Sequence, residues 1–450
     1  MERSILQNLN EWKLSSRRKP LILRGARQVG KTWVLREFGK SFPDGFIYIN
    51  LDEDPNYARL FETTKDIDRL TDMISMSTGQ KLTSDTLLII DEIQASGAAL
   101  NSLKYFCEKR PDYPVAAAGS LLGLHLSEGF PVGKVNFLEM YPMTFSEFLL
   151  ACHDDQLLRF MTSLTEFSAI PELFFEPLVE RLKQYFIVGG MPEAVLEWSE
   201  HKNAKEVDRI LDEILLSYEH DFGKHTNPFE ANKIRIIWDS VPSQLSRENK
   251  KFLYSAVKSG ARAREYESAL NWIVNADILH KIYSIEKPAL PITAYDDLNA
   301  FKIYMGDVGL LRRKSRLSAS TILEEDRLFT EFKGALTENY ILQSLLPQLD
   351  MNPRYWKDSK HEVDFIIQHE NDIFPVEVKA GGNVKANSIK AYGEKYADTT
   401  KYLLRFSLKN LSYDGKILNI PLFMADHLIR LLNLAQSTPL FSHSANKTIL

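Results

Sequence analysis

Short apolar runs alternate with helix-like segments over the first third of the chain. The runs are Leu21–Leu23, Phe46–Leu51, Leu87–Ile90, Val115–Ala118 and Val135–Phe137. Continuous apolar runs of this length are typical of strands buried on both faces. Strands that alternate with helices form βαβ units, so the pattern predicts an α/β fold with a parallel sheet over residues 21–140.

The middle of the chain has a helical pattern. Residues 144–230 are helix-rich, with a break at Gly189–Pro192. Two further helical patterns precede strand-like stretches rich in Ile and Tyr; they cover Arg247–Lys258 and Ala263–Ile278. This order is that of a winged helix-turn-helix, in which Arg262 and Arg264 would begin the helix that meets DNA. A helical lid or packing module that binds protein explains the same pattern, because fold does not fix function.

From about residue 300 the pattern returns to mixed α/β. The apolar spacing of Glu331–Leu346 predicts an amphipathic helix. Strands are expected after it at Arg354–Trp356, Glu362–Gln368, Ile373–Lys379 and Lys401–Phe406. The polar link His369–Asp372 makes a hairpin of the second and third of these strands.

Composition narrows the class of protein. A length of 450 residues allows several domains, and 44% hydrophobic with 26% charged residues is usual for a soluble globular protein. The net charge of −5 predicts no bulk attraction to nucleic acid, so DNA binding would need local basic patches. The cysteines, Cys107 and Cys152, suit a reducing compartment. The charged N-terminus and the lack of a long apolar stretch predict a cytoplasmic protein with no membrane span.

A glycine-rich loop follows the first strand and precedes a helix. Its residues are Gly25, Ala26, Arg27, Gln28, Val29, Gly30, Lys31 and Thr32, which spell G-x-x-x-x-G-K-[ST]. The backbone amides of such a loop wrap a polyphosphate, and the positive end of the helix faces the same anion. Lys31 would reach the β- and γ-phosphates, and the Thr32 hydroxyl would ligate Mg²⁺.

Two acids end the apolar run at 87–90. Asp91 would lie at the carboxyl edge of the sheet near the loop, where it would bind Mg²⁺ directly or through water. Glu92 is the candidate for polarising the attacking water. Ser120 follows the strand at 115–118 and would sense the γ-phosphate, although a turn serine is an equal explanation.

A second group of charged residues lies in the C-terminal hairpin. Glu377 and Lys379 project from one face of their strand, and Asp364 would lie beside them on the neighbouring strand. Glu338 could add a carboxylate from the preceding helix. Carboxylates with a lysine on one sheet face predict a Mg²⁺ site for phosphodiester hydrolysis, with Asp364 and Glu377 as metal ligands.

Exposed cross-strand salt bridges are the alternative explanation for these acids. The surrounding strands are apolar, however, and buried acids need partners or a metal, which favours a site. Lysines of the next helix would contact a phosphate backbone, although lysines on a solvated helix are common; they are Lys385, Lys390 and Lys395.

Several motifs together resemble one family. The segments GARQVGKT, LLIIDEIQ, AAGS, GGMPEAV, GARAREYE, YMGDVGLL and EVDFII…PVEVKAG are similar to those of prokaryotic AAA-type (P-loop) ATPases with a C-terminal DUF4143 domain related to the PD-(D/E)xK nucleases. The resemblance covers nearly the whole chain. It implies four domains: a P-loop core over 1–143, a helical lid over 144–229, a winged-helix-like domain over 230–299, and a restriction-endonuclease-like α/β domain over 300–450.

The resemblance also implies ATP and Mg²⁺ as cofactors, Walker A at 25–32, Walker B at 87–92 and Ser120 at the sensor-1 position. Relatives often read Val-Gly-Arg where this chain has Val132-Gly133-Lys134, and lysine cannot fork onto phosphate oxygens as arginine does. The nuclease-like motif reads Asp364, Glu377 and Lys379, with Pro375 two positions before Glu377.

We therefore expect Mg²⁺-dependent ATP hydrolysis, with Asp91 and Glu92 as catalytic residues. ATP hydrolysis could be coupled to DNA binding or cleavage by the C-terminal domain, for which the candidate residues are Glu338, Asp364, Glu377 and Lys379. Two alternatives stay open. One is a nucleotide-dependent switch or scaffold with a non-catalytic C-terminal domain that binds nucleic acid or a protein partner. The other is a DNA-binding regulator that acts through the winged helix. Oligomeric state stays open as well.

Overall fold

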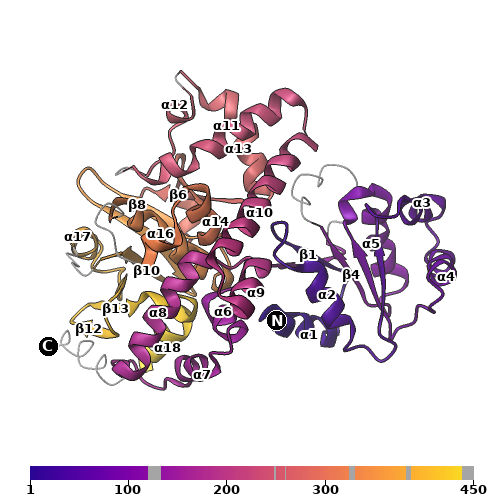
Figure 1. The fold of residues 1–450 in the computed structure, drawn as a ribbon, viewed down its shortest axis with the longest axis horizontal. Coiled ribbons are helices and arrows are strands. Elements are labelled where there is room, and N and C mark those ends of the chain that lie inside the picture. The colour runs from indigo at the N-terminus through magenta and orange to yellow at the C-terminus, as the bar shows by residue number, and fades with distance from the viewer. Residues whose placement is uncertain are drawn as a thin grey trace. The chain divides into compact units, whose positions relative to one another are not determined.

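The computed structural model describes residues 1–119, 133–224, 226–247, 250–258, 260–323, 330–381 and 387–437. The chain divides into two compact units. One consists of residues 2–141 with 271–278, and the other of residues 142–270 with 279–450. Figure 1 shows the elements of both units.

The N-terminal unit contains a five-stranded sheet in the order β2-β3-β4-β1-β5. Its strands are β1 (Leu21–Arg24), β2 (Phe46–Asn50), β3 (Leu87–Asp91), β4 (Val115–Ala118) and β5 (Asn136–Glu139). All neighbouring strands are parallel, which confirms the predicted sheet. Because the strands are parallel, the loop after β1 and the acids at the end of β3 lie at the same edge of the sheet. The strand β4 lies between β1 and β3.

Helices cover both faces of this sheet (Figure 1). They are α1 (Ile5–Leu14), α2 (Lys31–Gly39), α3 (Pro55–Thr63), α4 (Ile67–Thr78) and α5 (Gly97–Lys109), with the short 3-10 helix η1 (Ile93–Ala95) before α5. Side chains of α3, α4 and α5 such as Phe61, Leu70 and Leu103 share one apolar core with Ile47 and Leu88 of the sheet. Burial of this apolar surface holds the strand ends in place.

The second unit begins with a run of helices. They are α6 (Phe145–Ala151), α7 (Asp155–Ser163), α8 (Glu172–Val188), α9 (Pro192–His201), α10 (Ala204–Lys224), α11 (Pro228–Leu245), α12 (Tyr254–Val257) and α13 (Ala263–Asn275), of which the residues from 271 on belong to the first unit. The predicted break after α8 is confirmed. Gly189 has φ +74°, and a Cβ there would lie 2.2 Å from Asp307 Oδ1, so glycine is required at this close approach.

An eight-stranded sheet follows, in the order β12-β13-β11-β10-β9-β8-β6-β7. Its strands are β6 (Leu279–Ile285), β7 (Asp296–Met305), β8 (Arg354–Lys357), β9 (Glu362–His369), β10 (Asp372–Val378), β11 (Leu403–Ser407), β12 (Ser412–Asp414) and β13 (Ile417–Pro421). The helices of this region are α14 (Val308–Lys314), α15 (Ala319–Leu323), α16 (Thr330–Leu345), α17 (Asn387–Lys395) and α18 (Leu428–Ser437). The predicted helix at 331–346 and the β9–β10 hairpin are confirmed.

Two expectations for the middle of the chain differ from the structure. The helix expected over Arg247–Lys258 is helical only at α12 among its described residues, because the Phe252 amide donates to Phe301 O of β7 at 2.7 Å and the two rings stack. This contact holds the segment before α12 against the sheet. The boundary drawn between residues 299 and 300 falls inside β7, and β7 with β6 belongs to the C-terminal sheet.

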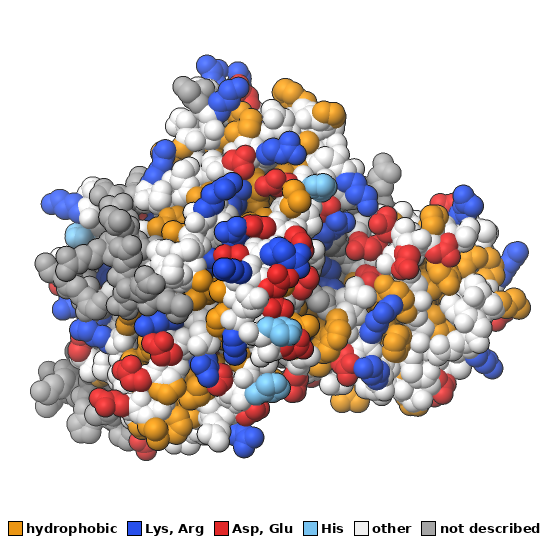
Figure 2. Space-filling view, in the orientation of Figure 1, with side chains coloured by type: hydrophobic (Ala, Val, Ile, Leu, Met, Phe, Trp, Pro, Cys, Tyr) orange, Lys and Arg blue, Asp and Glu red, His pale blue; other side chains and the backbone are white. Residues whose placement is uncertain are grey.

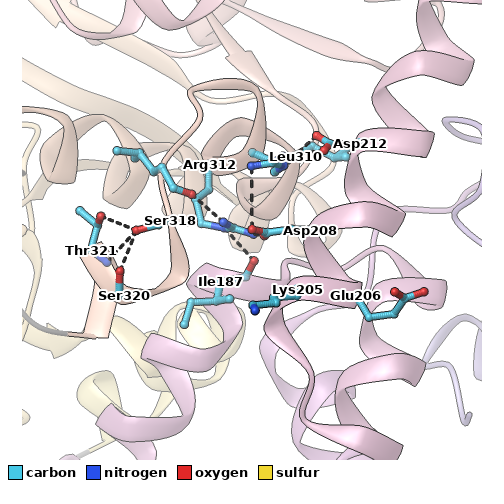
Figure 3. Close-up of polar contacts among 12 residues, drawn as sticks. Ile187, Lys205, Glu206, Asp208, Asp212, Leu310, Arg312, Ser318, Ser320 and Thr321 are labelled. Carbon is cyan, nitrogen blue, oxygen red and sulfur yellow. Dashed lines mark hydrogen bonds and ion pairs between the residues drawn. The ribbon is translucent and has the colours of Figure 1, made fainter.

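A buried arginine joins three segments of the helical region (Figure 3). The Arg312 side chain of α14 is fully buried. Its Nε donates to Ile187 O at 2.9 Å, its Nη1 donates to Leu317 O at 2.7 Å, and its Nη2 pairs with Asp208 of α10. Burial lowers the pKa of Arg312, and Asp208 opposes that shift. Each of these polar groups is therefore satisfied inside the fold, as buried groups must be.

Charges are mixed on the molecular surface. Acidic and basic side chains are interspersed on the face shown in Figure 2, in keeping with a net charge of only −5. Among the described parts of the chain, a helix both long and apolar enough to traverse a bilayer is not found.

Candidate functional site

The loop between β1 and α2 has a backbone that depends on glycine. Gly25 has φ +138°, and a Cβ there would lie 2.1 Å from Met140 O. Gly30 has φ +96° and is the N-cap of α2. Gln28 also has a positive φ, of 64°. Positive φ angles at several positions of one short loop help to turn backbone amides toward a common concavity, which is the geometry of an anion-binding loop.

The Lys31 side chain lies inside this loop and is hydrogen-bonded to its backbone. The side chain is buried, and its Nζ donates to Gly25 O at 2.8 Å and to Ala26 O at 2.7 Å. Burial lowers the pKa of Lys31 to about 8, against the attraction of the Glu92 and Asp91 carboxylates. The ammonium therefore lies within the loop, where its donors would exchange carbonyl oxygens for phosphate oxygens.

The end of β3 places Asp91 beside the loop. The Thr32 hydroxyl donates to Asp91 Oδ2 at 2.6 Å, and the Tyr48 hydroxyl donates to the same oxygen at 3.0 Å. The Glu92 amide donates to Asp91 Oδ1 at 3.0 Å. The structure thus brings together the hydroxyl and the carboxylate that the sequence assigned to Mg²⁺. Both are hard oxygen ligands of the kind that Mg²⁺ prefers.

Glu92 leaves the strand in a left-handed conformation, with φ 50°. Its Oε2 accepts a hydrogen bond from Gln94 Nε2 in η1. Of the other predicted residues here, Ser120 lies outside the described residues. Lys134 forms an ion pair with Glu108 of α5 at 3.1 Å.

Sequence reasoning missed Tyr48. Residues of β2 alternate between buried and half-buried positions, with Tyr48 and Asn50 on the half-buried side. The sequence did contain a signal for this residue: Tyr48 and Asn50 are polar side chains in an otherwise apolar strand.

In the C-terminal region, Asp364 is grouped with Glu338 of α16. Asp364 Oδ2 accepts from the Val378 amide at 2.7 Å. Burial raises the pKa of Asp364 to about 7, and the nearby Glu338 carboxylate adds to the shift. Glu338 forms an ion pair with Lys250 and accepts from the Tyr304 hydroxyl at 3.2 Å. Burial raises the Glu338 pKa, but Lys250 and then Lys302 outweigh burial and leave that pKa below its usual value.

Glu377 belongs to a different group. Its carboxylate pairs with Lys379 Nζ at 3.1 Å and is 3% exposed. Burial raises the pKa of Glu377, while Lys379 and Arg405 oppose the shift. The β9–β10 ladder is paired as far as Phe365 with Val376. Beyond that pair, the Asp364 side chain accepts its hydrogen bond from the Val378 amide of β10. Within the described ranges, no group of three or more His, Cys, Asp or Glu side chains is arranged to hold a metal.

A polar cavity of about 380 Å³ opens beside Asp364. Its walls combine acids with basic side chains; they include Glu338, Glu362, Lys250, Lys357, Lys360 and His361. Of the helix lysines expected to contact phosphate, Lys390 is exposed, Lys395 pairs with Asp358 at 3.7 Å, and Lys385 lies outside the described residues. Arg262 and Arg264 are exposed at the start of α13.

Comparison with protein families matches three parts of the chain. Residues 17–149 match the family model of an AAA domain. Residues 179–321 and 333–423 match two domains of unknown function, DUF8612 and DUF4143 respectively. Comparison with curated proteins gave no match.

Solved structures with some similarity are also found. A Walker-type ATPase of Pyrococcus abyssi is 14% identical with a TM-score of 0.44, covering 70% of this chain and 95% of that one. The Thermotoga maritima RuvB Holliday junction branch migration motor is 14% identical with a TM-score of 0.30, covering 62% and 89%. The Aeropyrum pernix Orc1 protein in complex with DNA is 11% identical with a TM-score of 0.25, covering 69% and 91%.

The sequence match over 17–149 lies largely within the unit that contains the glycine-rich loop, Lys31 and Asp91. Residues 17–149 are therefore similar to an AAA domain and contain a P-loop, and two regions that match domains of unknown function follow.

Proposed function

We propose that the protein binds ATP with Mg²⁺ in the N-terminal unit and hydrolyses it. One observation carries the proposal: Thr32 Oγ1 lies 2.6 Å from Asp91 Oδ2, next to a loop spanned by the buried Lys31. A positive charge, a metal-binding hydroxyl and a carboxylate are thus within one site at the N-terminus of α2. This combination serves phosphoryl transfer, where catalysis is mainly positioning and charge stabilisation.

The residues have separate tasks in this proposal. The amides of Gly25–Thr32 and the Lys31 ammonium bind the β- and γ-phosphates. Thr32 and Asp91 would hold Mg²⁺, which would supply positive charge to offset that of the phosphates. Glu92 orients the attacking water and accepts its proton. Glu92 Oε2 accepts from Gln94 Nε2, and a carboxylate has further lone pairs with which it can act as the base.

Glu92→Gln tests the assignment. The variant should bind ATP as the unchanged protein does, because no phosphate contact is lost, while turnover falls by about 100-fold or more. Glu62→Gln on the exposed side of α3 is the matched control and should hydrolyse ATP normally. Normal turnover in Glu92→Gln would refute the role of Glu92. An absence of ATP binding by the full chain would refute the whole proposal.

We propose as a second function that the C-terminal region binds DNA. The supporting observation is the cavity beside Asp364, where Lys360 is exposed on the wall and Lys357, also exposed, pairs with Glu362 at 3.1 Å. Cations on a polar cavity suit a phosphate backbone. The carboxylates as arranged do not fit a metal, because Glu338 is occupied by Lys250 and Glu377 by Lys379. We therefore propose that this region binds DNA without cleaving it.

Binding of linear and branched DNA, measured over a range of salt concentrations, tests this second function. A double Lys357→Gln, Lys360→Gln variant should bind more weakly with a shallower salt dependence. A double Lys401→Gln, Lys409→Gln variant, which removes two exposed lysines that are not on the cavity wall, is the control. Loss of binding only in an Arg262→Gln, Arg264→Gln variant would move the site to α13. Mg²⁺- or Mn²⁺-dependent cleavage that is lost in Asp364→Ala would establish a nuclease instead.

A further inference from the structure

The Tyr48 side chain connects β2 to the acid at the end of β3. Its hydroxyl donates to Asp91 Oδ2 at 3.0 Å and accepts from Asn50 Nδ2 at 3.3 Å. Asn50 and Asp91 are direct partners in the β2–β3 ladder. The two strands are therefore joined at this point by side chains as well as by their backbones. A hydroxyl that accepts one hydrogen bond becomes a better donor for the next.

The Tyr48 ring is held from the other side by α2. The Arg36 guanidinium lies 3.9 Å from the ring centroid. A cation over an aromatic face at this distance is attracted to it. The helix that begins at Lys31 thus contributes both Thr32 and Arg36 to the surroundings of Asp91.

Among the described residues, three hydrogen-bond donors reach the Asp91 carboxylate, and they differ in whether they would also contact a bound metal. The Glu92 amide fixes Oδ1, while Thr32 and Tyr48 share Oδ2. Thr32 is itself a proposed metal ligand, so its hydroxyl would serve the metal as well as Asp91. Tyr48 has no such second task, and it is the side chain that can keep Oδ2 in place. Hydrogen bonds to a ligand group orient it and tune its affinity for metal.

We infer that Tyr48 is a positioning residue, which orients the Asp91 carboxylate for the Mg²⁺-bound form of the nucleotide. The inference rests on the proposed function, because it requires Asp91 to act in metal binding. It predicts a defect that appears with Mg²⁺ and is absent without it. A residue that merely stabilised the fold would weaken nucleotide binding under both conditions.

The test compares Tyr48→Phe with the unchanged full chain in titrations of a fluorescent ATP analogue, once with Mg²⁺ and once with EDTA. The gain in affinity that Mg²⁺ provides should shrink by about tenfold in Tyr48→Phe. The affinity in EDTA should change by less than about twofold, because no phosphate contact is removed. The Mg²⁺ concentration at half-saturation should rise in parallel. Tyr57→Phe, at a partly buried tyrosine packed against the same core, is the matched control.

Two results would overturn the inference: an unchanged Mg²⁺ gain in Tyr48→Phe, or an equal loss of affinity with Mg²⁺ and with EDTA. Asp91→Asn separates these failures from failure of the proposed function. If Asp91→Asn abolishes the Mg²⁺ gain while Tyr48→Phe retains it, only the role of Tyr48 is refuted. If Asp91→Asn also keeps the full gain, the assignment of Asp91 to the metal is wrong. Thermal unfolding of each variant shows whether the fold is intact.

Discussion

The Thr32 hydroxyl donates to Asp91 Oδ2 at 2.6 Å, although the two residues are 59 positions apart in the chain. Thr32 lies in the first turn of α2, and Asp91 is the last residue of β3. The contact depends on strand order, since β4 separates β3 from the strand that leads into the loop. A parallel sheet brings such strand ends to one edge, so two local motifs become one site.

The charge of Lys31 should make nucleotide binding depend on pH. Burial lowers the pKa of Lys31 to about 8, so the free protein loses this ammonium as the pH rises through that value. Binding of a polyphosphate requires the proton again, and affinity should therefore fall by up to about tenfold per pH unit above it. Titrations with ATP from about pH 7 to about pH 10 measure the slope of affinity against pH.

Two variants serve as controls for this prediction. Lys31→Arg stays protonated and should show a flatter pH profile, while Lys31→Ala should lose most of its nucleotide affinity. A flat profile for the unchanged protein would contradict the prediction.

Gly25→Ala should disrupt the loop and the sheet beneath it. The added Cβ would meet Met140 O at 2.1 Å in a backbone with φ +138°, and both the clash and the φ disfavour alanine. We expect a loss of at least about 2 kcal/mol in the free energy of unfolding, together with weaker ATP binding. Gly97→Ala, in the first turn of α5 with open space around its Cβ position, is the control. Denaturant unfolding would contradict the prediction if both variants were equally stable.

Removal of the Arg312 guanidinium should destabilise the helical region. Arg312→Met leaves the carbonyls of Ile187 and Leu317 and the Asp208 carboxylate without their donor. The expected cost is about 3 kcal/mol, since groups left unpaired in the interior lose their solvation. Arg313→Met, whose ion pair with Asp212 is half-exposed, should cost less than about 1 kcal/mol. Urea unfolding of the two variants measures the difference, and equal costs would show that burial of Arg312 is unimportant.

Asp364 should make the stability of the C-terminal region depend on pH. Burial and Glu338 raise the folded pKa to about 7, so the folded state keeps a proton that the unfolded state releases near its ordinary value of about 4. The contribution of this group to stability therefore falls as the pH rises between those two values. Asp364→Asn should flatten the dependence in this window and gain stability relative to the unchanged protein at about pH 8.

Urea unfolding at about pH 5 and about pH 8 checks this effect. The exposed Asp414→Asn is the control, and it should leave the pH dependence unchanged. An identical pH dependence in Asp364→Asn and the unchanged protein would contradict the prediction.

The sequence predicted best where local pattern and burial agree. All five strands of the first sheet and the helix at 331–346 follow from apolar runs and helical spacing, and the structure confirms them. The loop residues could be read from one motif because glycine is required by backbone geometry.

Contacts between distant segments could not be read in this way. The pairing of Phe252 with Phe301 replaces a helical turn that local spacing had favoured. The pairing of Glu338 with Lys250 joins residues that are 88 positions apart, and no motif links them. The pairing of the two strands had placed Asp364 beside Glu377. Instead, the Asp364 carboxylate accepts a hydrogen bond from the Val378 amide, beyond the last paired residues of the ladder. Such contacts depend on tertiary structure, which a short pattern does not contain.

The hairpin β6–β7 completes the edge of the C-terminal sheet, and this limits how the chain can be divided for expression. A fragment starting at residue 300 would lack β6 and the first residues of β7. It would expose the flank of β8, where Tyr355 and Trp356 are now buried. Unpaired, apolar edges of this kind promote aggregation. Insolubility of such a fragment would therefore say nothing about the biological role of the region, and useful truncations should keep residue 279 and everything that follows it together.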